Sequence, residues 1–224
     1  MRDILIDGIP ILDLLEVTPS TSNVASLTNC DQSSVSRIYR HVSESLQLEF
    51  HKSNGTYRAH TNRELLSSLR QATQLLRIQR GAEQLQWVAS WWTSATLGNL
   101  REAPLPRSWP GEQRTFELLK SRVLDLAVVN SEDLPGVIVP ATNGPQQFGI
   151  WSAVPIAHYP QGLQPLLADP CATAASAPPA ATLCTDLILV RRELLDRPAI
   201  RALSQSIGQA YRQAYSHLDD IRWP

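Results

Sequence analysis

Polar and apolar residues between positions 32 and 46 follow a helical period. Apolar side chains recur there at steps of three and four: Val35, Ile38, Tyr39, Val42 and Leu46. This spacing places them on one stripe of an α-helix, while most of the polar residues fall on the opposite side. Asp31 precedes the stretch and belongs to the residue types that cap helix N-termini. The pattern predicts an amphipathic helix that begins at residue 32.

Two shorter helices are expected before it. Apolar residues over 12–15 suit a helix that ends at Thr18, because Pro19 steers the preceding residue away from helical geometry. The hydroxyl residues over 20–22 offer N-caps for a second helix, which carries Val24. Three short helices joined by turns of a few residues form a helix-turn-helix unit.

A β-hairpin is expected next. Residues 46–50 and 56–59 suit two short strands, and residues 51–55 between them end in Asn54-Gly55. Asn-Gly is a strong hairpin signal because both residue types tolerate a positive φ. The sequence therefore predicts a wing beside the helix-turn-helix unit.

A long helix is expected over residues 62–84. Leu65, Leu69, Ala72 and Leu76 step by four, three and four, which is the spacing of a coiled-coil seam. The seam lasts barely two heptads. The pattern predicts a short dimerisation helix.

Composition narrows the protein class. Of the 224 residues, 43% are hydrophobic and 18% are charged, and 20 basic residues face 21 acidic ones, which is typical of a globular chain of one or two domains. Three cysteines without metal-ligand spacing and no long apolar run favour a reducing cytoplasm and no membrane span. Between residues 37 and 80, however, the sequence contains eight basic residues and only three acidic ones. A local basic face of this kind suits a nucleic-acid partner.

The start of the helix from residue 32 carries the chemistry for duplex DNA. Glutamine and arginine side chains can bond base edges, while serine hydroxyls and cations can hold phosphates. The hairpin adds cations that can reach the adjacent backbone or minor groove. The candidate DNA-binding residues are Gln32, Ser33, Ser34, Ser36, Arg37, Arg40, Lys52, Asn54 and Arg58. The alternative for the same residues is a solvated helix face and an ordinary exposed hairpin.

Residues 32–37, reading QSSVSR, together with Val24-Ala25 before them and Phe50 and a basic wing after them, resemble the DNA-binding module of LysR-type transcriptional regulators. Residues 116–129, reading FELLKSRVLDLAVV, are similar to a helix-then-strand segment of that family's effector-binding domain. Residues 187–192 and the helix from 198 to 211 resemble its last strand and C-terminal helix. The resemblance implies a winged helix-turn-helix, a dimerising linker helix and an effector-binding domain.

The expected fold class is α/β overall. It comprises an all-α winged helix-turn-helix N-terminal domain over 1–60, a linker and dimerisation helix over 61–84 and a reduced α/β periplasmic-binding-protein-like domain over 85–224. The domain is expected to be reduced because 85–224 is too short for two lobes. An Ala/Pro-rich stretch over 168–181, expected to be a loop, occupies the place of the second lobe.

Residues after the first expected strand of this domain are weaker candidates for effector binding: Thr93, Ser94 and Thr96. Family members often place small hydroxyl side chains there. The alternative is that these hydroxyls cap a helix. Nearby Trp87, Trp91 and Trp92 suit either core packing or a contact surface.

Catalytic motifs are absent from the sequence. The five histidines show no metal-ligand spacing, and no P-loop, Gly-x-Ser-x-Gly or dinucleotide motif occurs. We therefore expect no enzyme, no metal and no cofactor. The leading hypothesis is a dimeric, sequence-specific DNA-binding transcriptional regulator of LysR type. Its expected partners are double-stranded DNA, a second copy in a homodimer or homotetramer, and a small-molecule effector. The alternative is a protein-interaction module derived from such a regulator that no longer depends on DNA or effector.

Overall fold

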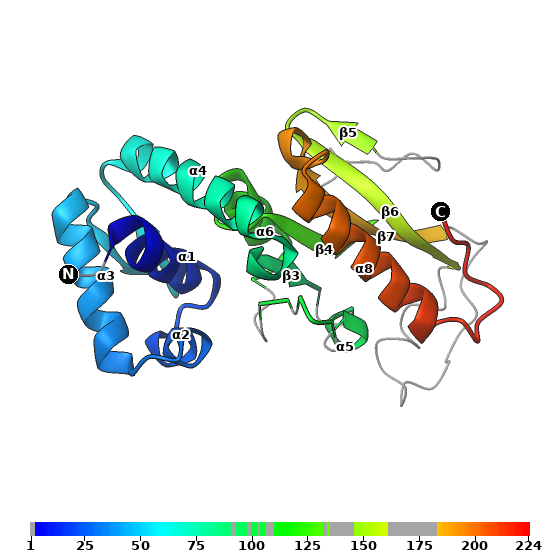
Figure 1. Ribbon diagram of the computed structural model, residues 1–224, viewed down its shortest axis with the longest axis horizontal. Coiled ribbons are helices and arrows are strands. Elements are labelled where there is room, and N and C mark those ends of the chain that lie inside the picture. The colour runs from blue at the N-terminus through cyan, green and yellow to red at the C-terminus, as the bar shows by residue number, and fades with distance from the viewer. Residues whose placement is uncertain are drawn as a thin grey trace.

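The computed structural model shows a mixed α/β protein, as expected. It describes residues 3–90, 93–97, 100–102, 104–105, 110–131, 134, 146–160 and 183–224. Figure 1 shows a group of N-terminal helices at one end, a long helix that leads away from them, and a sheet with helices at the other end.

The N-terminal part begins with three α-helices, as the apolar pattern predicted. A π-helical turn precedes them, and the bounds are η1 Ile4–Gly8, α1 Ile9–Val17, α2 Thr21–Thr28 and α3 Gln32–Leu46. The side chain of Ser20 accepts a hydrogen bond from the backbone N–H of Asn23 and caps α2. Asp31 caps α3 in the same way through the N–H of Ser34. Local side chains therefore set where α2 and α3 begin.

The hairpin consists of β1 Phe50–Ser53 and β2 Thr56–Ala59. The expected first strand over 46–50 was placed too early, because α3 continues to Leu46 and the strand begins at Phe50. Ser53 pairs with Thr56, so only Asn54 and Gly55 form the turn. Both have positive φ, 48° and 81°, as a two-residue hairpin turn requires.

A single core joins the helices and the hairpin. Its buried side chains come from α1, α2, α3, the start of the hairpin and the first turn of α4: Ile9, Ile11, Leu12, Leu14, Leu15, Val24, Ala25, Val35, Ile38, Val42, Leu48, Phe50 and Leu66. The buried residues of α3 in this core lie on the stripe predicted from the sequence. The opposite side of α3 is therefore left to solvent.

The long helix α4 spans Arg63–Arg80, which is shorter than the expected 62–84. Gly81 ends it with a φ of 109°, and a single 3-10 turn, η2 Ala82–Gln84, follows. A left-handed conformation at this position suits glycine because it has no Cβ.

The C-terminal part contains a five-stranded sheet in the order β3-β4-β7-β6-β5. Strands β3 and β4 are parallel, and the other neighbours are antiparallel. The bounds are β3 Trp87–Ala89, α5 Ser94–Leu97, α6 Glu112–Lys120, β4 Leu126–Asn130, β5 Gln146–Phe148, β6 Trp151–Pro160, β7 Leu183–Arg191, η4 Arg192–Leu194 and α8 Pro198–Ala214.

Helices cover both faces of the sheet. In β4, Leu126 and Val128 belong to the core under α8, whereas Ala127 and Val129 belong to the core under α6. Successive strand residues point to opposite faces, so a strand covered on both sides is apolar at every position. Figure 1 shows α8 lying along the sheet.

Several expectations about this part can be compared with the structure. Trp87 is fully buried in the core, so it takes no part in a contact surface. Trp91, Trp92 and the Ala/Pro-rich stretch over 168–181 lie outside the described residues. Within the described ranges, none of the helices is long and apolar enough to cross a bilayer.

Candidate nucleic-acid interface

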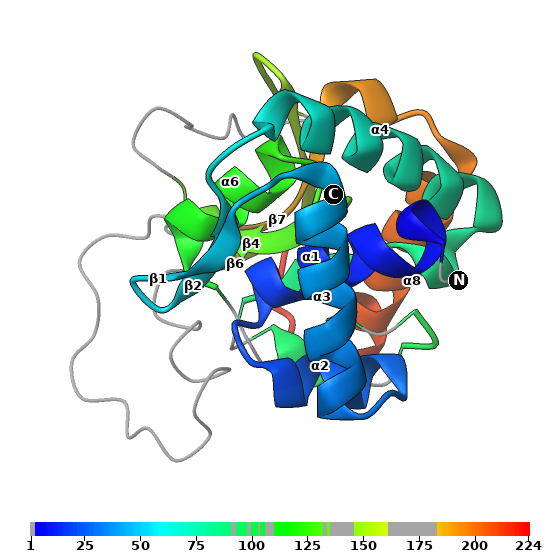
Figure 2. The same ribbon diagram turned by 90° about the vertical axis from the view of Figure 1, so that its left-hand side faces the viewer.

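Helix α3 presents its polar side at the outside of the molecule. Figure 2 shows α3 facing the viewer with the β1–β2 hairpin beside it, while the sheet and its helices lie behind. Gln32, Ser33, Arg37 and Arg40 are exposed along this helix. The described part of the C-terminal region therefore leaves the polar side of α3 open.

The first turn of α3 is held by the carboxylate of Asp31. One carboxylate oxygen accepts hydrogen bonds from the Ser33 hydroxyl and the Ser34 N–H, and the other accepts one from the Ser34 hydroxyl at 2.7 Å. These bonds hold the pKa of Asp31 well below its usual range, first through Ser33 and then through Ser34. The carboxylate thus stays ionised at the N-terminus of α3.

The serines predicted to face outward do not all do so. Ser34 is buried, and its hydroxyl also accepts a hydrogen bond from a guanidinium nitrogen of Arg37 at 3.0 Å. Its position follows from the cap, because residue N3 of the helix must turn toward Asp31. Ser36 is half-buried, and Ser33 remains exposed. Ser34 therefore orients Arg37 instead of presenting its own hydroxyl.

Gln32 and Arg40 occupy the two ends of the exposed side. The amide nitrogen of Gln32 donates to the Thr21 hydroxyl at 2.8 Å and thereby links α3 to α2. The guanidinium carbon of Arg40 lies 5.9 Å from the centroid of the Tyr39 ring, a cation–π distance. Both side chains are exposed but oriented by a neighbour.

Aromatic side chains fix the hairpin against α3. Tyr39 of α3 meets Phe50 at 6.4 Å and Tyr57 at 5.8 Å between ring centroids. Phe50 and Tyr57 stack at 5.6 Å across the hairpin. Burial raises the pKa of Tyr57, with the neighbouring Tyr39 adding to the effect. The position of the hairpin relative to α3 is therefore set by packing.

The three candidate residues of the hairpin point to different places. Lys52 is exposed, and its ammonium donates to the carbonyl of Pro19 at 2.8 Å. Asn54 is exposed at the tip. Arg58, in contrast, donates to the carboxylate of Glu117 on α6 at 2.8 Å. Arg58 is thus engaged with the C-terminal part, whereas Lys52 and Asn54 remain on the open side.

The candidate effector residues are engaged within the chain. Thr93 is fully buried, and its hydroxyl donates to the carbonyl of Ser90 at 3.0 Å. The Thr96 hydroxyl lies 2.6 Å from the hydroxyl of Tyr215 near the end of α8. Nothing is described of the side chain of Ser94. The Thr93 hydroxyl thus bonds to the segment before it, and Thr96 bonds to the C-terminal part of the chain.

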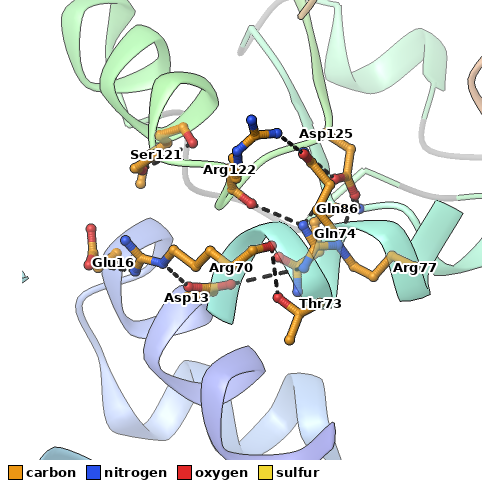
Figure 3. A network of polar contacts seen from close by, with 11 residues as sticks. Asp13, Glu16, Arg70, Thr73, Gln74, Arg77, Gln86, Ser121, Arg122 and Asp125 are labelled. Carbon is orange, nitrogen blue, oxygen red and sulfur yellow. Dashed lines mark hydrogen bonds and ion pairs between the residues drawn. The ribbon is translucent and has the colours of Figure 1, made fainter. Parts of the chain in front are cut away.

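Apart from Leu66, helix α4 buries polar residues. Figure 3 shows Arg70 reaching from α4 to Asp13 and Glu16 of α1, at 2.7 Å in both cases. Arg77, one heptad further, donates to Asp125 through two nitrogens at 2.9 Å. Heptad spacing places both guanidiniums on one side of the helix.

This buried network connects the two parts of the chain. Asp125 also accepts hydrogen bonds from Gln74 of α4 at 3.0 Å and from the backbone N–H of Gln86 at 2.8 Å. Burial raises the pKa of Asp13, although Arg70 and Arg77 act in the opposite direction. The buried carboxylates of this network are therefore stabilised as anions by the arginines, and removing an arginine would leave an uncompensated buried charge.

The predicted leucine seam of α4 is left partly uncovered. Leu65 is 42% exposed, and Leu69, Ala72 and Leu76 are half-buried. Leu75, near the seam, is 45% exposed. An apolar stripe on the surface of a helix is the kind of feature that a second helix covers.

The buried side of α4 was not predicted from the sequence. Arg63, Arg70 and Arg77 recur every seven residues, with Thr73 and Gln74 between the last two. This second heptad pattern was visible in the sequence, but solvent is the ordinary environment of arginine. Only the carboxylates of distant segments reveal that Arg70 and Arg77 are buried.

Comparison with known proteins gives no match to a family model and none to a curated protein sequence. Among solved structures, a full-length OxyR variant from Pseudomonas aeruginosa matches with 11% identity and a TM-score of 0.48, covering 95% of each chain. ArgP from Mycobacterium tuberculosis matches with 13% identity and a TM-score of 0.40, over 94% of this chain and 97% of that one.

The regulator LysG from Corynebacterium glutamicum, solved at full length with bound arginine as effector, matches with 12% identity and a TM-score of 0.37, over 93% of this chain and 99% of that one. These matches are at 11–13% identity and at TM-scores below 0.5. Similarity at this level does not assign a function, which has to come from the residues of this chain.

Proposed function

We propose that the protein is a sequence-specific DNA-binding transcriptional regulator of LysR type. The observation that carries the proposal is the open side of α3, where Gln32, Ser33, Arg37 and Arg40 stand exposed beside the hairpin that carries Lys52 and Asn54. Amide and guanidinium groups on one exposed helix match base edges in a major groove, and hairpin cations match phosphates.

The roles of the candidate residues follow from their contacts. Arg37 is oriented by Ser34, so its guanidinium is prepared for a guanine or a phosphate. Lys52, held at the carbonyl of Pro19, is assigned to the phosphate backbone. Arg58 contributes only when its ion pair with Glu117 opens. The proposed location is the cytoplasm, the reducing compartment that the three cysteines already favoured.

The proposal includes a dimer, or a tetramer built from dimers. Two recognition helices about 34 Å apart enter successive major grooves and double the contacts with DNA. The stripe of Leu65, Leu69, Ala72 and Leu76 on α4 is the surface that we assign to the second copy. We propose the domain limits 1–60, 61–84 and 85–224 for this arrangement.

The proposal is tested by selecting bound duplexes from a random DNA library with the full chain. We expect one enriched sequence with two related half-sites. Lys52→Ala should then lower the slope of binding against salt by about one unit, since one phosphate contact is lost. Arg201→Ala, on the remote helix α8, is the control and should leave the slope unchanged. If no sequence is enriched and binding is absent at about 50 mM salt, the proposal is wrong.

A further inference from the structure

A pocket of about 430 Å³ lies where the hairpin meets the C-terminal part of the chain. Its walls come from β2, from the first turns of α4, from α6 and from the end of α1. The charged residues that line it are Glu16, Arg58, Arg63, Arg70, Arg114, Glu117 and Lys120. The pocket is separate from the open side of α3 and from the segment with Thr93 and Thr96.

The pocket has an excess of positive charge. Five of its charged residues are basic and two are acidic. Glu117 is shared between Arg58 at 2.8 Å and Arg114 at 2.9 Å, and Glu16 is shared between Arg70 at 2.7 Å and Arg114 at 2.8 Å. Two carboxylates thus serve three guanidiniums of the pocket, and Asp13 also neutralises one of these, Arg70.

Some hydrogen-bond donors of the pocket have no acceptor within the described part of the chain. Within the described part of the chain, Arg63 and Lys120 form no ion pair. The Nε atom of Arg114 is buried and has no hydrogen-bond partner there. A buried donor without an acceptor is costly, and guanidinium groups bind carboxylates and phosphates best in pairs of hydrogen bonds. Arg63, Arg114 and Lys120 all line this pocket.

We propose that this pocket binds a compact anion with two or more negative charges, a phosphorylated or polycarboxylate small molecule. The guanidinium groups of the pocket already bind the carboxylates of Glu16 and Glu117. They can bind the oxygen atoms of a small oxyanion through the same kind of hydrogen bond. Its volume admits a small molecule, and its charged walls attract anions from solution.

Binding at this place changes the environment of the hairpin. Arg58 belongs to β2, and its ion pair with Glu117 is one contact between the hairpin and α6. An anion that bonds Arg58 and Arg114 replaces Glu117 as their partner. An anion in the pocket thus competes with the ion pair that holds Arg58 of the hairpin against Glu117 of α6.

The first test is a calorimetric titration of the full chain with inorganic phosphate and with pyrophosphate, at constant ionic strength and without DNA. We expect saturable binding, stronger for pyrophosphate. The double variant Arg63→Ala/Lys120→Ala removes two exposed cations of the pocket and should weaken binding at least roughly tenfold. Arg80→Ala, an exposed arginine at the other end of α4, is the matched control and should change affinity less than about twofold.

A second variant gives the opposite sign. Glu117→Gln keeps the shape of the side chain but removes a competing negative charge, so binding of pyrophosphate should tighten by roughly threefold or more. A residue with a purely structural role would not produce a gain. Unchanged or weaker binding by Glu117→Gln overturns the proposal, as does the absence of saturable binding up to about 10 mM pyrophosphate.

A third measurement separates a free anion from a phosphate of DNA. If the pocket serves the DNA backbone instead, Arg63→Ala/Lys120→Ala weakens duplex binding while the wild type ignores pyrophosphate. That result overturns the proposal and leaves the proposed function intact. Conversely, saturable binding of pyrophosphate by a chain that ignores every duplex supports the pocket and contradicts only the regulator.

Discussion

Helices α3 and α4 both carry two or more arginines on a polar side, yet the two sides have opposite environments. Arg37 and Arg40 of α3 are exposed; Arg37 donates to the Ser34 hydroxyl, and Arg40 lies near the Tyr39 ring. Arg70 and Arg77 of α4 are buried against carboxylates from α1 and from the segment before β4. The residue type is the same, so the difference lies in what other segments bring to each helix.

The comparison separates cations that stabilise the fold from cations that remain available to a ligand. A buried guanidinium that is already neutralised by carboxylates contributes to folding and has few donors left for a phosphate. An exposed guanidinium contributes little to folding and keeps its donors for a partner. Arg58 and Arg114 lie between these extremes, since their carboxylate partners are shared and partly exposed.

The largest expected effect is on stability, from Arg70→Ala. Removing this guanidinium leaves the fully buried Asp13 with only Arg77, 3.9 Å away. We expect a loss of about 3–5 kcal/mol in the free energy of unfolding, the range for breaking a buried ion pair. Denaturant unfolding measures it. Arg80→Ala on the same helix should change the free energy by less than about 0.5 kcal/mol. Equal effects of the two variants would contradict the contrast between buried and exposed arginines.

The second expected effect is on DNA affinity, from Arg37→Ala. Binding to the selected duplex should weaken by about 1–3 kcal/mol if Arg37 contacts a base. The free energy of unfolding should change by less than about 0.5 kcal/mol, because the side chain is exposed. Fluorescence anisotropy and denaturant unfolding measure the two quantities. If the variant has a lower free energy of unfolding but unchanged DNA affinity, Arg37 stabilises the fold and does not contact DNA.

The third expected effect is on assembly, from Leu65→Glu in the uncovered seam of α4. A charge at this position opposes a second seam, so the dimer should dissociate at least about tenfold more readily, or about 1.4 kcal/mol. Sedimentation equilibrium measures the dissociation constant. Gln71→Glu adds the same charge at another exposed position of α4 and is the control. An unchanged dimer would move the interface away from this seam.

The smallest expected effect is a pH dependence, from Asp31. Its pKa is lower in the folded chain than in the unfolded chain, so the cap stabilises α3 at neutral pH. This contribution should begin to disappear as the pH falls below about 4, the ordinary range of an aspartate. Asp31→Asn keeps a capping oxygen without the charge and should lack this part of the acid response. Thermal unfolding of both chains between pH 3 and 7 would detect the difference, and parallel curves would contradict it.

The N-terminal part followed the sequence closely because local signals determine it. Ser20 and Asp31 cap the helices that they were expected to cap, and the stripe of α3 is buried as expected. The hairpin was misplaced at its first strand because Leu48 and Phe50 are equally compatible with a strand and with the core under α3. Register was decided by the pairing of Ser53 with Thr56.

The elements of the C-terminal part were harder to predict from the sequence. The helix-then-strand segment over residues 116–129 and the last strand and helix were expected, whereas β6, ten residues long, was not. Its apolar residues are interrupted by Ser152, Pro155 and His158, which hides the period of a strand. A bulge between Pro155 and Ala157 accommodates the proline in the ladder.

By itself, the sequence determined the starts of α2 and α3, the Asn-Gly turn and the exposed polar side of α3. All of these depend on contacts between residues close together in the chain. Only the tertiary structure decided which arginines are exposed and which are paired with carboxylates. Asp13 and Asp125 are 57 and 48 residues away from Arg70 and Arg77, respectively, and Glu117 is 59 residues away from Arg58. A periodic pattern shows that side chains share a face, but the electrostatics of that face depends on which charges folding brings opposite to it.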